Sequence, residues 1–150
     1  MVISNSFISE TTLAIRDILI SGVSDPISSS RTGDEKFVVT GYPQRTVKYP
    51  ILTVLATNSP VPTRLGLRSE MAFATVELEI RIWARNNKER DVLTDLVHNQ
   101  LRGIQTDAST GTIDLGLYGF QITSMVNVSE EGPGAIQSKV ITVKYNVVLT

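Results

Sequence analysis

The segment from Ser69 to Arg85 alternates between apolar and polar side chains, and this pattern constrains the fold more than any other stretch. Its even positions are all apolar: Ala72, Ala74, Val76, Leu78, Ile80, Ile82 and Ala84. Its odd positions are mostly polar or charged: Thr75, Glu77, Glu79, Arg81 and Arg85. A period of two predicts one long strand with one face on a core and the other on water or a partner. Because strands usually span about five or six residues, this one must pair with neighbours along its length.

An amphipathic helix is predicted directly after this strand. Asn86 and Glu89 have the spacing of a capping box, which marks a helix start. A single apolar stripe follows: Val92, Leu93, Leu96, Val97, Leu101 and Ile104. Gly103 is predicted to end this helix. An earlier helix is predicted from about Ser6 to Gly22, where apolar residues recur at helical spacing.

Four further segments are predicted to be strands: Lys36 to Tyr42, Tyr49 to Thr57, Leu115 to Val128 and Ile136 to Leu149. The polar segment Ser24 to Glu35 is predicted to be a loop without regular structure. Short connections between the strands favour antiparallel pairing. The sequence therefore predicts a single α+β domain over residues 1–150, with a mainly antiparallel sheet of about five strands and two amphipathic helices packed on one face.

Composition excludes several classes of function. The chain of 150 residues has no cysteine, which excludes disulfides and thiolate metal sites, and its one histidine, His98, gives too few ligands for a zinc cluster. The net charge is −1, from 14 basic and 15 acidic residues. The basic residues are scattered and form no stripe of the kind with which proteins bind nucleic acid. No apolar run approaches bilayer length and no signal peptide is recognisable, so we expect a soluble protein made in the cytoplasm, with no membrane partner.

The sequence offers no arrangement typical of catalysis. His98 falls in the middle of a predicted helix, and the chain has no strand-to-helix Gly-x-Ser-x-Gly turn. Glu77 and Glu79 share one strand face about 7 Å apart, but beside Arg81 they are typical of a solvated or salt-bridged strip. We therefore expect a protein that is not an enzyme, with no catalytic, cofactor-binding or metal-binding residues.

Two regions are candidates for contact with another subunit. The Pro-rich loop Asn58 to Arg68 carries the apolar residues Val61 and Leu65, which either pack onto their own chain or dock on another one. Phe73 and Trp83 lie at the two ends of the polar face of the long strand, and aromatic residues on such a face are a mild interface signal.

The element order and some local sequence resemble the tail terminator (tail completion) proteins of long-tailed bacteriophages and related tailed viruses. The matching segments are Tyr49-Pro50-Ile51-Leu52-Thr53-Val54, the alternating run from Val76 to Ala84, the helix that opens at Asn86, and a last strand that ends at Leu149. The resemblance covers the chain from about Phe7 to Leu149.

The resemblance implies a virion structural protein of the tail or neck, assembled in the host cytoplasm. Such a subunit forms a hexameric ring that caps the tail tube, stops its polymerisation and provides the surface for head attachment. Its partners are further copies of itself, the tail tube protein and a head-completion or neck protein, and no cofactor is implied. The interface candidates in this chain are Val61, Arg64, Leu65, Arg68, Phe73 and Trp83, with Glu130 and Glu131 at a predicted hairpin tip.

Two alternatives stay open at this stage. Another head-to-tail neck or connector protein could have the same small α+β design. A small-ligand binding module or an enzyme would need a concave pocket with convergent polar groups. A deep cavity near His98 and the Glu77 and Glu79 strip would favour that second alternative.

Overall fold

β4, Ala72–Ala84, is the central strand and pairs with neighbours on both of its edges. The computed structural model describes residues 7–33, 35–41, 48–58, 62–64, 72–106, 117–129 and 136–149. The other elements are α1 (Phe7–Gly22), the short 3-10 turn η1 (Ser28–Ser30), β1 (Val38–Thr40), β2 (Ile51–Ala56), β3 (Thr63–Arg64), α2 (Asn87–Thr106), β5 (Leu117–Ser129) and β6 (Gln137–Leu149).

The strands form one sheet in the order β1-β2-β4-β6-β5. β6 pairs with β4 over 13 residues, from Ala72↔Leu149 to Ala84↔Gln137. On the other edge of β4, β2 pairs with residues 78–83, and β3 pairs with residues 72 and 73. Every pairing is antiparallel except that of β1 with β2. The predicted α+β fold with a mainly antiparallel sheet is confirmed, with β3 as an additional short strand inside the Pro-rich loop.

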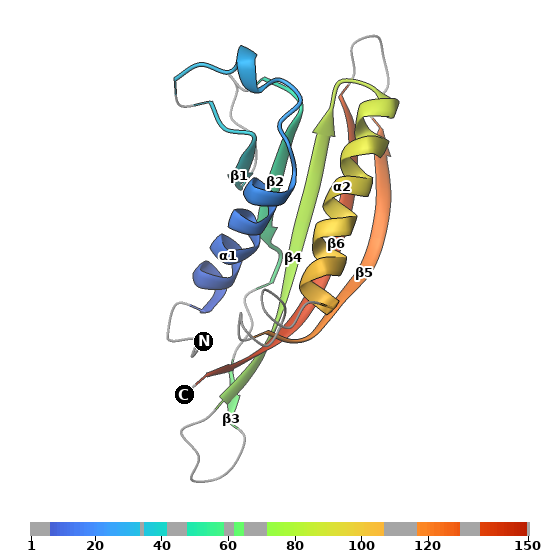
Figure 1. Cartoon of the computed structure of the whole chain (residues 1–150). Coiled ribbons are helices and arrows are strands. Elements are labelled where there is room, and N and C mark those ends of the chain that lie inside the picture. The colour runs from blue at the N-terminus through green and yellow to red at the C-terminus, as the bar shows by residue number, and fades with distance from the viewer. Residues whose placement is uncertain are drawn as a thin grey trace.

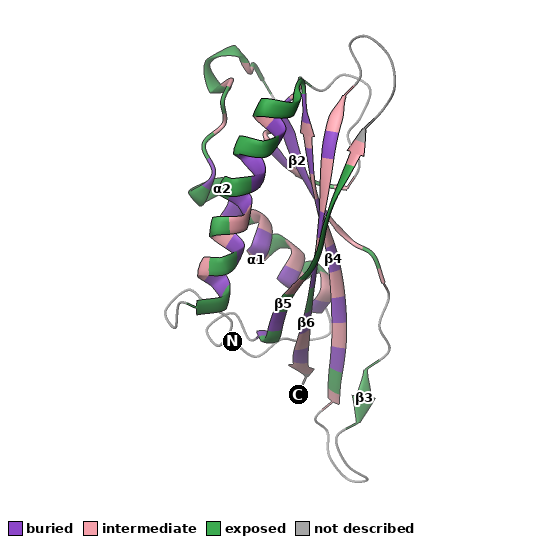
Figure 2. Cartoon of the chain, turned by 90° about the vertical axis from the view of Figure 1, so that its right-hand side faces the viewer, coloured by how far each residue is buried: buried purple, intermediate pink, exposed green. Residues whose placement is uncertain are grey.

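Both helices cover the same face of the sheet (Figure 1), with α1 beside β1 and β2 and α2 against β4, β6 and β5. The even positions of β4 from Ala74 to Ala84 are buried beneath them, whereas the odd positions are half-buried or exposed. No described helix covers the second face of the sheet (Figure 2). We call it the open face; β4 contributes to it Phe73, Thr75, Glu77, Glu79, Arg81 and Trp83. Neither described helix has the combination of length and apolarity that crossing a membrane requires.

The start of α2 agrees with its predicted cap, but its end does not lie at Gly103. The Asn86 Oδ1 atom accepts a hydrogen bond from the Glu89 N–H at 2.9 Å, and the Glu89 carboxylate accepts one from the Arg85 N–H at 3.1 Å. The helix then continues through Gly103 to Thr106. The burial of Ile104, only 2% exposed, extends the apolar face past the glycine, so tertiary packing overrides the low helix propensity of Gly103.

The segment Ser24 to Glu35 contains the turn η1 and is fastened to the body of the protein by Arg31. The Arg31 side chain, only 6% exposed, pairs with Asp25 at 2.5 Å and lies over the Phe37 ring at 5.5 Å. It also donates to the Lys48 carbonyl at 2.9 Å and to the Pro50 carbonyl. The prediction of a loop without regular structure was therefore wrong here, because one planar guanidinium organises several groups that lie far apart in the sequence.

Tyr145 of β6 connects the sheet to α1 through the core. Its ring is fully buried and stacks on Phe120 at 6.1 Å between ring centroids. Its hydroxyl donates to the Thr11 Oγ1 atom at 2.6 Å, and that hydroxyl in turn donates to the Phe7 carbonyl at 2.8 Å. Burial raises the pKa of Tyr145 from 10.0 to about 12, and the Thr11 hydrogen bond opposes this rise.

Tyr145→Phe tests this buried hydroxyl. At neutral pH we expect the variant to lose about 1 kcal/mol of unfolding free energy, because the hydrogen bond to Thr11 is gone. The folded pKa lies above the unfolded one, so this tyrosine's contribution is fully present below pH 10 and is lost as the pH rises toward 12. Between about pH 9 and about pH 11.5, wild type should therefore lose roughly 2 kcal/mol more than the variant. Urea unfolding at several pH values measures this, and parallel pH profiles would contradict it.

Gly103→Ala is expected to stabilise the protein. A Cβ atom at this position meets no atom within 4 Å, and the residue lies inside α2 with no positive φ angle. Replacing a helical glycine with alanine reduces the entropy of the unfolded chain, so the unfolding free energy should rise by about 0.5–1 kcal/mol. Thermal unfolding followed by circular dichroism measures the change, and an unchanged or lower midpoint would contradict the prediction.

Candidate assembly surface

One end of the open face holds a closed cluster around Trp83. The Trp83 Nε1–H donates to the Thr53 Oγ1 atom at 3.0 Å, and the Arg81 guanidinium lies over the indole at 4.1 Å from its centroid. Arg81 also donates to the Ser138 Oγ atom at 3.1 Å, and the Ser138 hydroxyl donates to the Val128 carbonyl at 3.0 Å. The cluster connects side chains from β2, β4 and β6 to β5, so the polar groups of Trp83 and Arg81 are satisfied within the chain.

In the middle of β4, a side chain completes the strand edge between β2 and β3. The Asn58 amide donates to the Thr75 carbonyl at 3.0 Å, and its Oδ1 atom accepts from the Glu77 N–H at 2.9 Å. The Thr57 N–H donates to the Glu77 carbonyl at 2.9 Å. The Asn58 side chain thus makes the hydrogen bonds to β4 that the backbone of a neighbouring strand would otherwise make. Sequence reasoning placed Asn58 only at the start of a loop, since no local pattern marks such a long-range side-chain bond.

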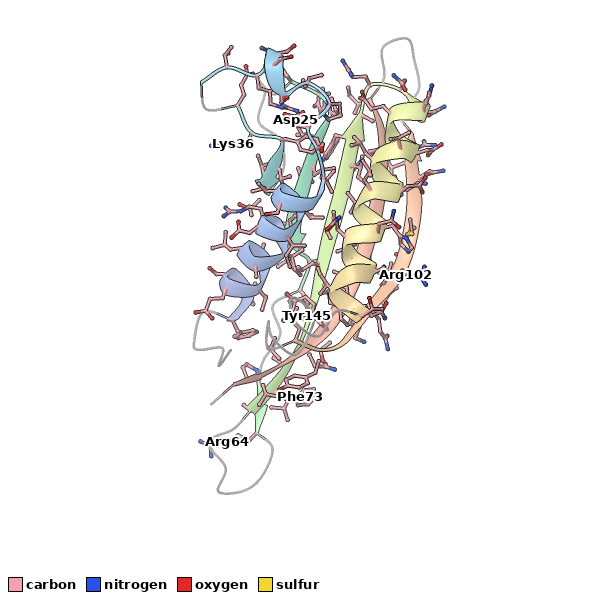
Figure 3. The ribbon with its side chains drawn as sticks, viewed as in Figure 1. Asp25, Lys36, Arg64, Phe73, Arg102 and Tyr145 are labelled. Carbon is pink, nitrogen blue, oxygen red and sulfur yellow. The ribbon has the colours of Figure 1, made fainter. Side chains whose placement is uncertain are left out.

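The other end of the open face carries Phe73, and Arg64 lies at the same tip on the opposite face of the sheet, because it pairs with Ala72. β3 places Thr63 opposite Phe73 and Arg64 opposite Ala72. This end of the sheet extends beyond both helices, and the labelled side chains lie near its tip (Figure 3). Phe73 is 37% exposed and Arg64 is exposed, and within the described chain neither makes an ion pair or ring contact. An aromatic ring and a guanidinium at a projecting tip are side-chain types that interfaces favour.

The structure therefore separates the predicted interface residues into three groups. Arg64 and Phe73 lie at the same tip on opposite faces of the sheet, whereas Trp83 lies at the opposite end of β4, ten residues along the strand from Phe73. The remaining candidates fall outside the described residues: Val61, Leu65, Arg68, Glu130 and Glu131.

His98 and the two glutamates do not form a common site. His98, Arg102 and Gln105 of α2 line a shallow groove of about 460 Å³ with Gln121 and Ile122 of β5, on the helix-covered side. Glu77 and Glu79 are half-buried on the open face, so the sheet separates them from His98. Across the part of the chain that the structure describes, no cluster of three or more histidine, aspartate or glutamate side chains could hold a metal ion.

No family model matches this sequence, and no curated protein is similar to it at a significant level.

Trp83 and Phe73 are expected to respond differently to truncation. Trp83→Ala should lower the unfolding free energy by about 2–3 kcal/mol, because it removes a half-buried ring and leaves Thr53 and Arg81 without their contacts. Phe73→Ala should cost less than about 1 kcal/mol, because its side chain is exposed and makes no ring contact with a described residue. Chemical denaturation of both variants measures the difference, and equal losses would contradict this division of roles.

Proposed function

We propose that this chain is a tail terminator subunit of a long-tailed virus, which assembles as a hexameric ring on the end of the tail tube. The observation that carries the proposal is the projecting end of the sheet, where Phe73 on the open face and Arg64 on the opposite face extend past the helices. An exposed aromatic anchor, with a cation on the other face of the same tip, suits a contact that is buried only after assembly.

Two features of the fold support a ring in particular. A ring needs a heterologous interface, in which two different surfaces of identical subunits meet. The projecting tip and the surfaces that flank the helix layer are such different surfaces, and they lie on different parts of the subunit (Figure 1). The element order of helix, strand pair, long strand, helix and strand pair also agrees with the pattern on which the resemblance rests.

In this proposal the ring stops polymerisation of the tube by occupying its last layer and presents its other side to the head. The partners are the tail tube protein and a head-completion or neck protein. The Phe73 and Arg64 tip is the surface that we assign to subunit or tube contact.

The proposal is tested by native mass spectrometry of the wild-type chain, alone and with the purified tail tube protein of the same virus. We expect a hexamer, either alone or in the presence of the tube protein. Phe73→Asp should prevent its formation, because a charge would be buried without a partner. Leu96→Asp is the matched control, since Leu96 is 38% exposed, close to the 37% of Phe73, but lies in α2. Wild type that never joins the tube protein would refute the proposal, and a complex with neck proteins alone would assign the chain to the neck.

A further inference from the structure

β5 forms an open edge of the sheet that is unusual in length and composition. It spans 13 residues and lies last in the strand order, and within the described chain no strand pairs with its outer edge. The opposite edge strand, β1, has only three residues. The sequence of β5, LYGFQITSMVNVS, contains no charged residue and no proline, although natural proteins commonly use both to protect exposed strand edges.

Three exposed side chains of β5 are large and apolar, and they stand among the exposed polar residues Gln121, Thr123, Ser124 and Asn127. Tyr118, Met125 and Val126 are 50%, 42% and 53% exposed. The pairing of β5 with β6 is interrupted by two register shifts, the second between Ile122 and Ser124. Beyond it the ladder with β6 is regular from Ser124 to Ser129. Its composition and geometry fit an extended chain segment as the binding partner.

The flank of α2 above β5 changes charge along its length. Asp91 lies 3.6 Å from Lys139, which pairs with Asn127 near the end of β5. His98 and Arg102 lie further along α2, in the groove shared with Gln121 and Ile122. Figure 3 shows Arg102 extending from the β5 side of the helix.

Two charged side chains of this flank are available for a partner. Asp95 follows Asp91 by one helical turn, and Arg102 follows Asp95 by two, so all three share the flank. Asp95 and Arg102 are exposed, and neither makes an ion pair with a described residue. The flank is therefore acidic toward the end of β5 and basic toward its start.

We propose that β5 pairs with β5 of a second copy of this chain, antiparallel and around a two-fold axis roughly perpendicular to the sheet. This symmetry keeps both helix layers on one side and reverses the direction of the second α2. When the axis passes close to Thr123, level with the middle of α2, the acidic part of one flank faces the basic part of the other. Asp95 then meets Arg102 of the second copy, and the same contact occurs again across the axis.

The spacing of the elements permits these contacts. α2 packs against β4, β6 and β5, so two copies joined at β5 hold their helices about three strand spacings, or roughly 14 Å, apart. Directly packed helices lie about 8–10 Å apart, and long side chains span the remaining gap. The pairing also covers Met125 and Val126, which are exposed in the single chain.

The first test introduces a charge into the edge. Wild type should dimerise in sedimentation equilibrium between about 1 µM and about 1 mM, and Val126→Lys should weaken the dimer at least about tenfold. Ile20→Lys is the matched control, because Ile20 of α1 is also 53% exposed and lies away from β5; its dimer should be unchanged. A wild-type monomer at all concentrations, or equal effects of the two lysines, would overturn the proposal.

The second test exploits the symmetry. Arg102→Glu places two like-charged pairs across the axis and should weaken the dimer about tenfold. The double variant Asp95→Arg with Arg102→Glu restores opposite charges at both contacts and should recover wild-type affinity. Recovery is specific to self-pairing, since a different partner would keep its own charges. Failure of the double variant to exceed the single one would refute the arrangement.

This inference goes beyond the proposed function and does not depend on it. Phe73→Asp is expected to abolish the ring and leave the β5 dimer intact, whereas Val126→Lys is expected to abolish the dimer. The two proposals can therefore fail separately.

Discussion

The pairing of β4 along both of its edges is the constraint on which the rest of the structure depends. A strand with 13 residues committed to ladders has its side chains fixed alternately on two faces, and the even positions are apolar throughout. One face must therefore be covered, and α1 and α2 cover it. The odd positions are then left on a face without helices. The open face follows from that strand, because the same alternation that builds the core also creates it.

Periodic patterns predicted the elements, because burial on one side leaves a regular signal in the sequence. β4, α1, the start of α2 and the four other predicted strands follow directly from such patterns. The features that these patterns did not predict are hydrogen bonds between single side chains and backbone groups that are distant in the sequence. Arg31 reaches the carbonyls of Lys48 and Pro50, and Asn58 bonds to both Thr75 and Glu77. A polar residue in a loop has no periodicity, so nothing local distinguishes these two from solvated neighbours.

The sequence predicted a group of candidate interface residues, but it did not distinguish those that bond within the chain from those that stay exposed. Phe73 and Trp83 are both aromatic and lie on the same face of β4, yet their surroundings differ. Trp83 is paired with Thr53 and Arg81, and both partners depend on the register between β2 and β4. Phe73 lies where β2 has ended and only the two-residue β3 remains. Strand pairing, which the sequence did not specify, decides which aromatic residue is available to another molecule.

The two edges of the sheet differ in the length of their strands, and this difference determines which edge can pair with a long strand of another molecule. On one side the edge is divided among β1, β3 and the Asn58 side chain, all too short to pair with a long strand. On the other side β5 is long, uncharged and regular over its second half. A two-fold contact at β5 is isologous and closes on itself, whereas a ring requires a heterologous contact. Because the projecting tip and the β5 edge are different surfaces, a subunit that uses β5 to pair with one copy keeps the tip free for another. The same chain could then protect its open edge before assembly and still join a ring through the tip.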